Sequence, residues 1–84
     1  MFRRNEVLRS KLPSRAKIVY VYLCDRANKD GLCWPSQKLI ANDLNISIST
    51  VERAIGDLRK AGFIKTIQRV RGNGSWSSLL YFLL

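Results

Sequence analysis

The stretch ANDLNISISTVERAI, at residues 41–55, interrupts a helical spacing of apolar residues and then resumes it. Apolar residues recur at this spacing on both sides of the break: Leu39, Ile40 and Leu44 before it, and Val51, Ala54, Ile55 and Leu58 after it. Between them, Asn45 can take the left-handed backbone conformation of a tight helix end, and Ser47 can cap the helix that follows. The stretch therefore predicts two short helices at a fixed angle, a helix-turn-helix. A helical hairpin within an ordinary core is the alternative interpretation.

The flanking residues set the limits of these two helices and indicate another helix before them. Pro35 and Ser36 mark the start of the first, and Gly62 marks the end of the second. A helix is also predicted at residues 16–27, with Ser14 as its N-cap. Much of this segment is β-branched or aromatic and would suit a buried strand, but its alanines and its length favour a helix.

The C-terminal third of the chain has the composition of a β-hairpin. Residues 64–71 and 76–84 are rich in β-formers, and the sequence GNGS at residues 72–75 between them is typical of a hairpin turn. Residues 32–34 suit a very short strand, which ends at a proline. The expected fold class is therefore α+β: a winged helix-turn-helix with a three-helix core and a C-terminal β-hairpin wing. We place this domain at residues 13–84, preceded by a basic N-terminal arm at residues 1–12.

The charge of the chain indicates its class of partner. Fifteen Lys and Arg residues against six Asp and Glu residues leave a net charge of +9, which suits a polyanion such as nucleic acid. A basic surface that serves only solubility is the alternative.

Several other classes of function lack the residues they need. The chain has no histidine and two cysteines, too few ligands for a zinc site, and Cys24 and Cys33 are expected to be small apolar residues in a reducing compartment. It has no Gly-rich phosphate loop and no nucleophile motif, so we expect neither an enzyme nor a cofactor. No apolar run approaches the roughly 20 residues of a membrane span, and no signal peptide is evident, so the expected location is the cytoplasm.

The chain resembles a known family over nearly its whole length, and three motifs are the most specific part of the resemblance. They are CWPSQ at residues 33–37, the residues Ile46, Ser47, Ser49, Thr50 and Val51 around the turn, and AGFI at residues 61–64. These residues are similar to the winged helix-turn-helix domains of plasmid, phage and integrative-element proteins, many of them replication initiators and others transcription regulators. The resemblance implies binding to double-stranded DNA. The chain departs from the family in having Asn45 where glycine is usual and Ile48 where a polar or basic residue is common.

The expected DNA contacts fall into two groups. Base edges would meet the exposed start of the second helix of the motif, at Ile48, Ser49, Thr50 and Arg53. Phosphates would meet polar and basic residues around it and on the wing, at Arg15, Lys17, Ser36, Lys38, Ser47, Lys60, Lys65, Arg69, Arg71 and Asn73. Ile48 suits contact with a thymine methyl group, and equally a helix end packed against another protein chain.

The last strand is apolar on both faces, which is unusual for a terminal hairpin of a small domain. Leu80, Phe82 and Leu84 alternate with other apolar residues, and no charged residue follows Arg71. We expect these three residues to be covered by a second copy of the chain, by the N-terminal arm or by a further domain; a fraying tail is the alternative. A protein-interaction module on the same scaffold is the competing function. RNA binding is a weaker third, because the aromatic residues resemble core residues and form no stacking platform.

Overall fold

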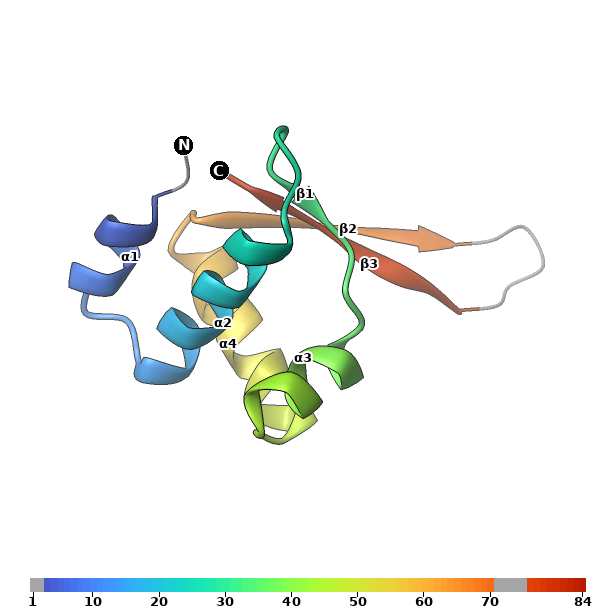
Figure 1. Cartoon of the computed structure of the whole chain (residues 1–84), viewed down its shortest axis with the longest axis horizontal. Coiled ribbons are helices and arrows are strands. Elements are labelled where there is room, and N and C mark those ends of the chain that lie inside the picture. Colours follow the sequence, from blue (N-terminus) through green and yellow to red (C-terminus); the bar gives the residue numbers. More distant parts are fainter. Residues whose placement is uncertain (1–2, 71–75) are drawn as a thin grey trace.

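The chain forms helices and a small antiparallel sheet. The computed structural model describes residues 3–70 and 76–84, and at residues 68–70 and 76–79 it describes only the backbone. The elements are α1 (Arg4–Arg9), α2 (Ser14–Arg26), β1 (Leu32–Cys33), α3 (Gln37–Leu44), α4 (Ile48–Lys60), β2 (Ile64–Val70) and β3 (Trp76–Leu83) (Figure 1). The predicted α+β class and winged helix-turn-helix architecture are confirmed. The structure adds α1 to the three predicted core helices, and β1 joins the hairpin as a third strand.

The break at Asn45 is the turn of the helix-turn-helix, as predicted. Asn45 has φ of 56° and so takes the left-handed conformation that ends α3. The backbone N–H of Ile46 then donates to the Ala41 carbonyl at 3.0 Å, which closes the helix end. These local bonds define how the chain leaves α3 and enters α4.

Both helices of the motif start at serine caps: Ser47, which was predicted as a cap, and Ser36, which was predicted as the start of its helix. The Ser36 hydroxyl accepts from the Leu39 N–H at 3.0 Å, and the Ser47 hydroxyl accepts from the Thr50 N–H at 3.1 Å. Gly62, with φ of 81°, follows α4 as predicted. The helix starts and ends therefore arise from residues close together in the sequence.

The predicted cap of α2 is wrong by one residue. Pro13 occupies the cap position, and Ser14 is the first residue of the helix and makes no side-chain cap bond. The Pro13 carbonyl already accepts from the Ala16 N–H at 3.0 Å, so the helical bonds begin one residue earlier than the serine signal indicates.

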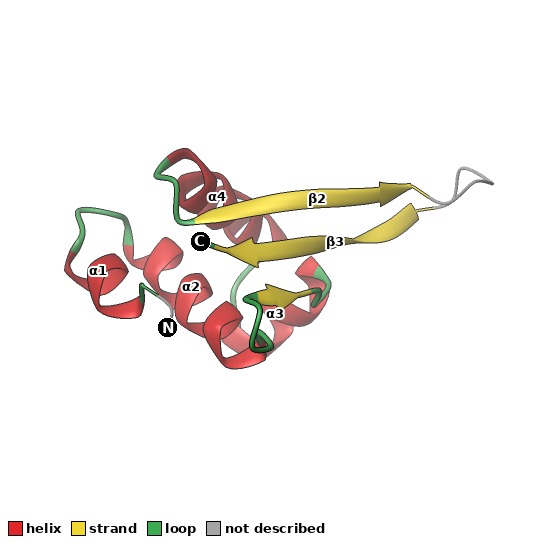
Figure 2. Ribbon diagram, turned by 90° about the horizontal axis from the view of Figure 1, so that it is seen from above, coloured by secondary structure: helices red, strands yellow, loops and turns green. Residues whose placement is uncertain are grey.

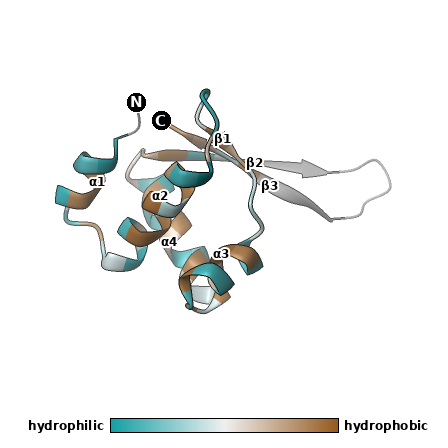
Figure 3. Ribbon diagram, in the orientation of Figure 1, coloured by the Kyte–Doolittle hydropathy of each residue, from teal (hydrophilic) through white to brown (hydrophobic). Residues whose placement is uncertain are grey.

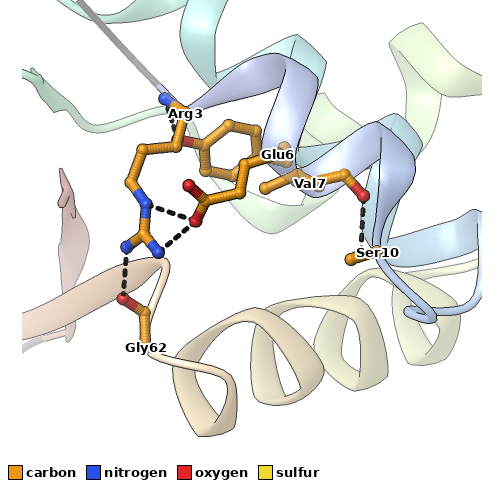
Figure 4. A network of polar contacts seen from close by, with 6 residues as sticks. Arg3, Glu6, Val7, Ser10 and Gly62 are labelled. Carbon is orange, nitrogen blue, oxygen red and sulfur yellow. Dashed lines mark hydrogen bonds and ion pairs between the residues drawn. The ribbon is translucent and has the colours of Figure 1, made fainter.

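The segment expected to be an N-terminal arm contains helix α1, whose Val7 is fully buried in the common core. Arg3 holds the start of this helix against the rest of the domain (Figure 4). Its backbone N–H donates to the Tyr20 hydroxyl at 3.1 Å, and its guanidinium pairs with Glu6 and donates to the Gly62 carbonyl at 3.3 Å. The guanidinium carbon also lies 4.4 Å from the centre of the Phe63 ring. The sequence gives little sign of this helix, because six residues show only weak periodicity. The residues that hold it in place are distant in the chain.

A single core joins the helices to one face of the sheet. Hydrophobic residues gather where α2 meets α3 and α4 (Figure 3). All four residues of the predicted stripe on α4 are buried: Val51, Ala54, Ile55 and Leu58. Leu39 differs from the expectation, because it is 40% exposed on the outer side of α3.

The sheet has the order β1-β3-β2, with β3 in the middle (Figure 2). Tyr81 of β3 pairs with Cys33 of β1 and with Thr66 of β2, and both Tyr81 and Leu83 are buried. The inner face of β3 therefore seals the core. The register shifts between Gln68 and Val70, near the far end of the hairpin.

Candidate nucleic-acid interface

The surface of α4 that faces away from the core is polar and charged. Its buried stripe packs into the core, which leaves Ile48, Ser49, Glu52, Arg53, Arg59 and Lys60 exposed. Ile48 is the first residue of the helix and is 46% exposed. Ser49 and Arg53 lie one helical turn apart on this surface. The structure therefore brings together three of the four predicted base contacts: Ile48, Ser49 and Arg53.

Thr50, the fourth, is placed differently. It is half-buried, and its hydroxyl lies 2.8 Å from the Ser47 hydroxyl, which also accepts from the Thr50 N–H. The side chain is therefore engaged in capping α4, which makes it a weaker candidate for contact with a base.

Glu52 is a further exposed residue of this surface and is not among the predicted contacts. It follows Ser49 by three residues, so helical spacing alone would have found it. A carboxylate here repels phosphates but can accept from the amino group of cytosine. No ion pair involves Glu52 within the described part of the chain.

The predicted phosphate contacts near the motif divide into engaged and available groups. The hydroxyls of Ser36 and Ser47 cap their helices. Arg15 is committed to α4, because its Nε lies 3.0 Å from a carboxylate oxygen of Asp57. Lys17 is half-buried and lines a hollow between α1 and α2, with Leu8 in the same wall. Residues 36 and 47 lie at the N-termini of α3 and α4, where backbone N–H groups can contact a phosphate.

Among the predicted DNA contacts, the available cations are Lys38 on α3, Arg53 and Lys60 on α4 and Lys65 on β2, which are exposed and have no ion-pair partner among the described residues. Acidic side chains elsewhere are held by arginines: Glu6 by Arg3, Asp25 by Arg4, Asp43 by Arg26 and Asp57 by Arg15. Most of the acidic charge is therefore neutralised internally, which leaves the positive charge of these four residues to act outward.

The wing is anchored to α4 at its base. Arg59 of α4 donates to the Thr66 hydroxyl of β2 at 3.2 Å, and the two strands extend past the helices (Figure 1). Arg69 lies on β2, where only the backbone is described, and the predicted contacts Arg71 and Asn73 and the turn at residues 72–75 lie outside the described residues.

The outer face of the sheet is an apolar surface, unlike the polar and charged outer surface of α4. Leu80 and Phe82 are half-buried, and Leu84 is 41% exposed. Leu80 pairs with Ile67, which is 48% exposed, and Phe82 lies between Lys65 and Leu32. The predicted two-sided strand therefore has one face in the core and one partly open.

The two cysteines are free thiols in the core. Burial raises the pKa of Cys33 to about 11 and raises the pKa of Cys24, so both are protonated at neutral pH and behave as small apolar residues. Residues 3–70 and 76–84 contain no cluster of three metal-ligating side chains. None of the described helices has the length and apolar character needed to cross a bilayer.

Comparison with known proteins supports the assignment of α3 and α4. Residues 10–64 match the family model described as a helix-turn-helix domain. Protein YmfN of Escherichia coli (strain K12) is 40% identical over 53 residues, which is 63% of this chain and 12% of that protein, so the chain spans only a small part of this relative. A solved structure described as a possible transcriptional regulator from Methanosarcina mazei Go1 superposes with a TM-score of 0.70 at 16% identity, over 99% of this chain and 67% of that one. This last likeness shows a shared fold.

Proposed function

The chain belongs to the helix-turn-helix domain family, and from this premise we propose that it binds double-stranded DNA in a sequence-specific manner through α4. The observation that carries the proposal is the outer surface of α4, where Ser49 and Arg53 stand exposed on a helix held by a fully buried stripe. Rigid support from the core positions such side chains to meet base edges.

In the proposed complex the N-terminal half of α4 lies in the major groove, which is wide enough to admit a helix. Arg53 donates to a guanine, and Ile48 contacts a thymine methyl group. Lys38, Lys60 and Lys65 contact phosphates, joined by Arg69, Arg71 and Asn73 of the wing. Arg15 and Lys17 are the least favoured of the predicted phosphate contacts, because one is paired and the other lines the hollow beside α1.

The biological setting is a separate proposal. The resemblance of the motifs to mobile-element proteins supports a cytoplasmic role in replication initiation or transcription regulation of a plasmid, phage or integrative element. The fold shared with a possible transcriptional regulator agrees with the second of these roles. Mapping the bound sites in the genome distinguishes them, because a replication initiator binds clustered repeats at an origin and a regulator binds promoters.

A salt titration with Arg53→Ala beside it tests DNA binding. The wild-type affinity for duplex DNA should fall steeply with log salt, because each neutralised phosphate releases counterions. Arg53→Ala should weaken binding to a site selected from random sequence by roughly 1–3 kcal/mol and relax the preference at one base pair. Fluorescence anisotropy over a range of salt concentrations measures both. Little affinity at any salt would instead favour a protein-interaction module, and an equal loss on random DNA would make Arg53 a phosphate contact.

We also propose that the chain forms a dimer through the outer face of the sheet. Leu80, Phe82 and Leu84, with the exposed Ile67, make an apolar surface that association would remove from water. A two-fold dimer would present two copies of α4 to an inverted repeat. A further domain of a longer polypeptide is the competing cover for these residues.

Sedimentation equilibrium over a wide concentration range tests the dimer. Wild-type protein should associate, and Leu80→Lys and Phe82→Lys should each yield a folded monomer, because a lysine on this face places charge in the contact. Leu8→Lys, at a leucine that is 45% exposed on α1, is the control and should still associate. A wild-type protein that stays monomeric would contradict the dimer and favour the further domain.

A further inference from the structure

Gly56 lies in the interior of α4 without a structural reason inside the domain. Glycine destabilises a helix interior relative to alanine, because the unfolded chain gains freedom and the helix gains no side chain. A Cβ atom at Gly56 would meet no described residue within 4 Å, so neither packing nor a close helix contact there accounts for the glycine. Gly62, by contrast, has a positive φ that accounts for its glycine. The open space at Gly56 is therefore free for a group from outside the domain.

Helical spacing places Gly56 on the candidate recognition surface. It follows Ser49 by seven residues and Arg53 by three, and it precedes Lys60 by four, so these four residues share one face of α4. Arg53 and Lys60 are both exposed and unpaired within the described chain. At Gly56 the helix backbone therefore carries no side chain, and this gap lies between two available cations.

The dimensions of the DNA major groove indicate which part of the DNA would lie next to Gly56. Gly56 follows Ile48 by eight positions, which is roughly 12 Å along a helix axis. The major groove is about 8.5 Å deep, so when α4 enters the groove with its N-terminus toward the base edges, Gly56 lies near the rim, where the sugar-phosphate backbone lies. Absence of a side chain lets a backbone approach closely.

We propose that a phosphate group of the DNA backbone packs directly against Gly56, beside Lys60. This inference rests on the proposed function and deepens it, because it defines how far α4 enters the groove. It makes Gly56 a positioning residue, which acts by allowing contact and not by donating a bond from a side chain.

Gly56→Ala tests the proposal because it should change folding and binding in opposite directions. Alanine should raise the melting temperature by roughly 2–8 °C through its helix propensity. If the added methyl group displaces the phosphate as overpacking does, the affinity should fall roughly five- to 150-fold. The loss should be equal on a selected site and on a random-sequence duplex, because a phosphate carries no sequence information.

The control is Asn5→Ala, which also exchanges an exposed helical residue for alanine, but on α1. It should leave DNA affinity unchanged. Wild-type affinity in Gly56→Ala, or a lowered melting temperature, would overturn the proposal, and so would a loss confined to the selected site. These outcomes are separate from failure of the proposed function, in which the wild-type chain itself shows no salt-dependent binding to the duplex.

Discussion

Replacing Leu58 with alanine is expected to lower the free energy of unfolding by about 2–5 kcal/mol. Leu58 is fully buried at the end of the stripe that holds α4 in the core. The substitution removes apolar contacts and leaves a cavity that the surrounding helices fill only in part. A domain of 84 residues has a total stability of roughly 4–13 kcal/mol, so this single change removes a large share of it. Chemical denaturation followed by circular dichroism measures the loss.

Leu39→Ala is the matched control for this change. The same atoms are removed from a leucine that is 40% exposed on the neighbouring helix of the motif. The expected effect is within about 0.5 kcal/mol, as for most surface substitutions. Equal losses in the two variants would contradict the placement of α4 against the core, and with it the geometry of the recognition surface.

Raising the pH from 10 to 12 is expected to remove about 2 kcal/mol of stability through Tyr81 alone. Burial raises the pKa of Tyr81 to about 12; the nearby Cys33 acts in the same direction and Gln37 against it. Its hydroxyl has no hydrogen-bond partner with suitable geometry among the described residues. In the unfolded chain a tyrosine loses its proton near pH 10, so over this range the folded state binds the proton more tightly. Stability is therefore complete below pH 10 and is lost as the pH rises toward 12.

Tyr81→Phe isolates this contribution. At neutral pH the variant should be as stable as the wild type or more stable, because it removes a buried hydroxyl that lacks a partner. Between pH 10 and 12 its stability should fall by about 2 kcal/mol less than that of the wild type. Parallel denaturation curves from pH 8 to 12 make the comparison. Identical pH profiles would show that the Tyr81 hydroxyl is accessible to water in the folded state.

Part of the candidate site could be predicted without the structure. Ser36, Asn45, Ser47 and Gly62 act where they were expected, since caps and turns are formed by residues a few positions apart. The buried stripe of α4 was predicted for the same reason: helical spacing determines which residues share a face. The exposed position of Arg53 follows directly from that spacing, and the same argument should have included Glu52 and Gly56.

Other features depend on contacts between distant parts of the chain. Arg15 and Lys17 are both basic residues in the first turns of α2, yet one pairs with Asp57 of α4 and the other lines a hollow beside α1. Helix α1 is stable where it lies because Arg3 reaches Tyr20 and Gly62. The pairing of β1 with β3 joins Cys33 to Tyr81. Local sequence carries no signal for such pairings, because each depends on the packing of all the elements at once.

The helix-turn-helix, its caps and the side of α4 that faces outward could therefore be predicted from the sequence, because each depends on residues within a few turns of one another. Contacts between distant elements, by contrast, determine which of the described basic residues are held in ion pairs, that Thr50 is half-buried beside Ser47, and that α1 belongs to the core. The reason is physical: backbone geometry is set by neighbours along the chain, whereas the partners and exposure of a side chain are set by whatever the fold brings beside it.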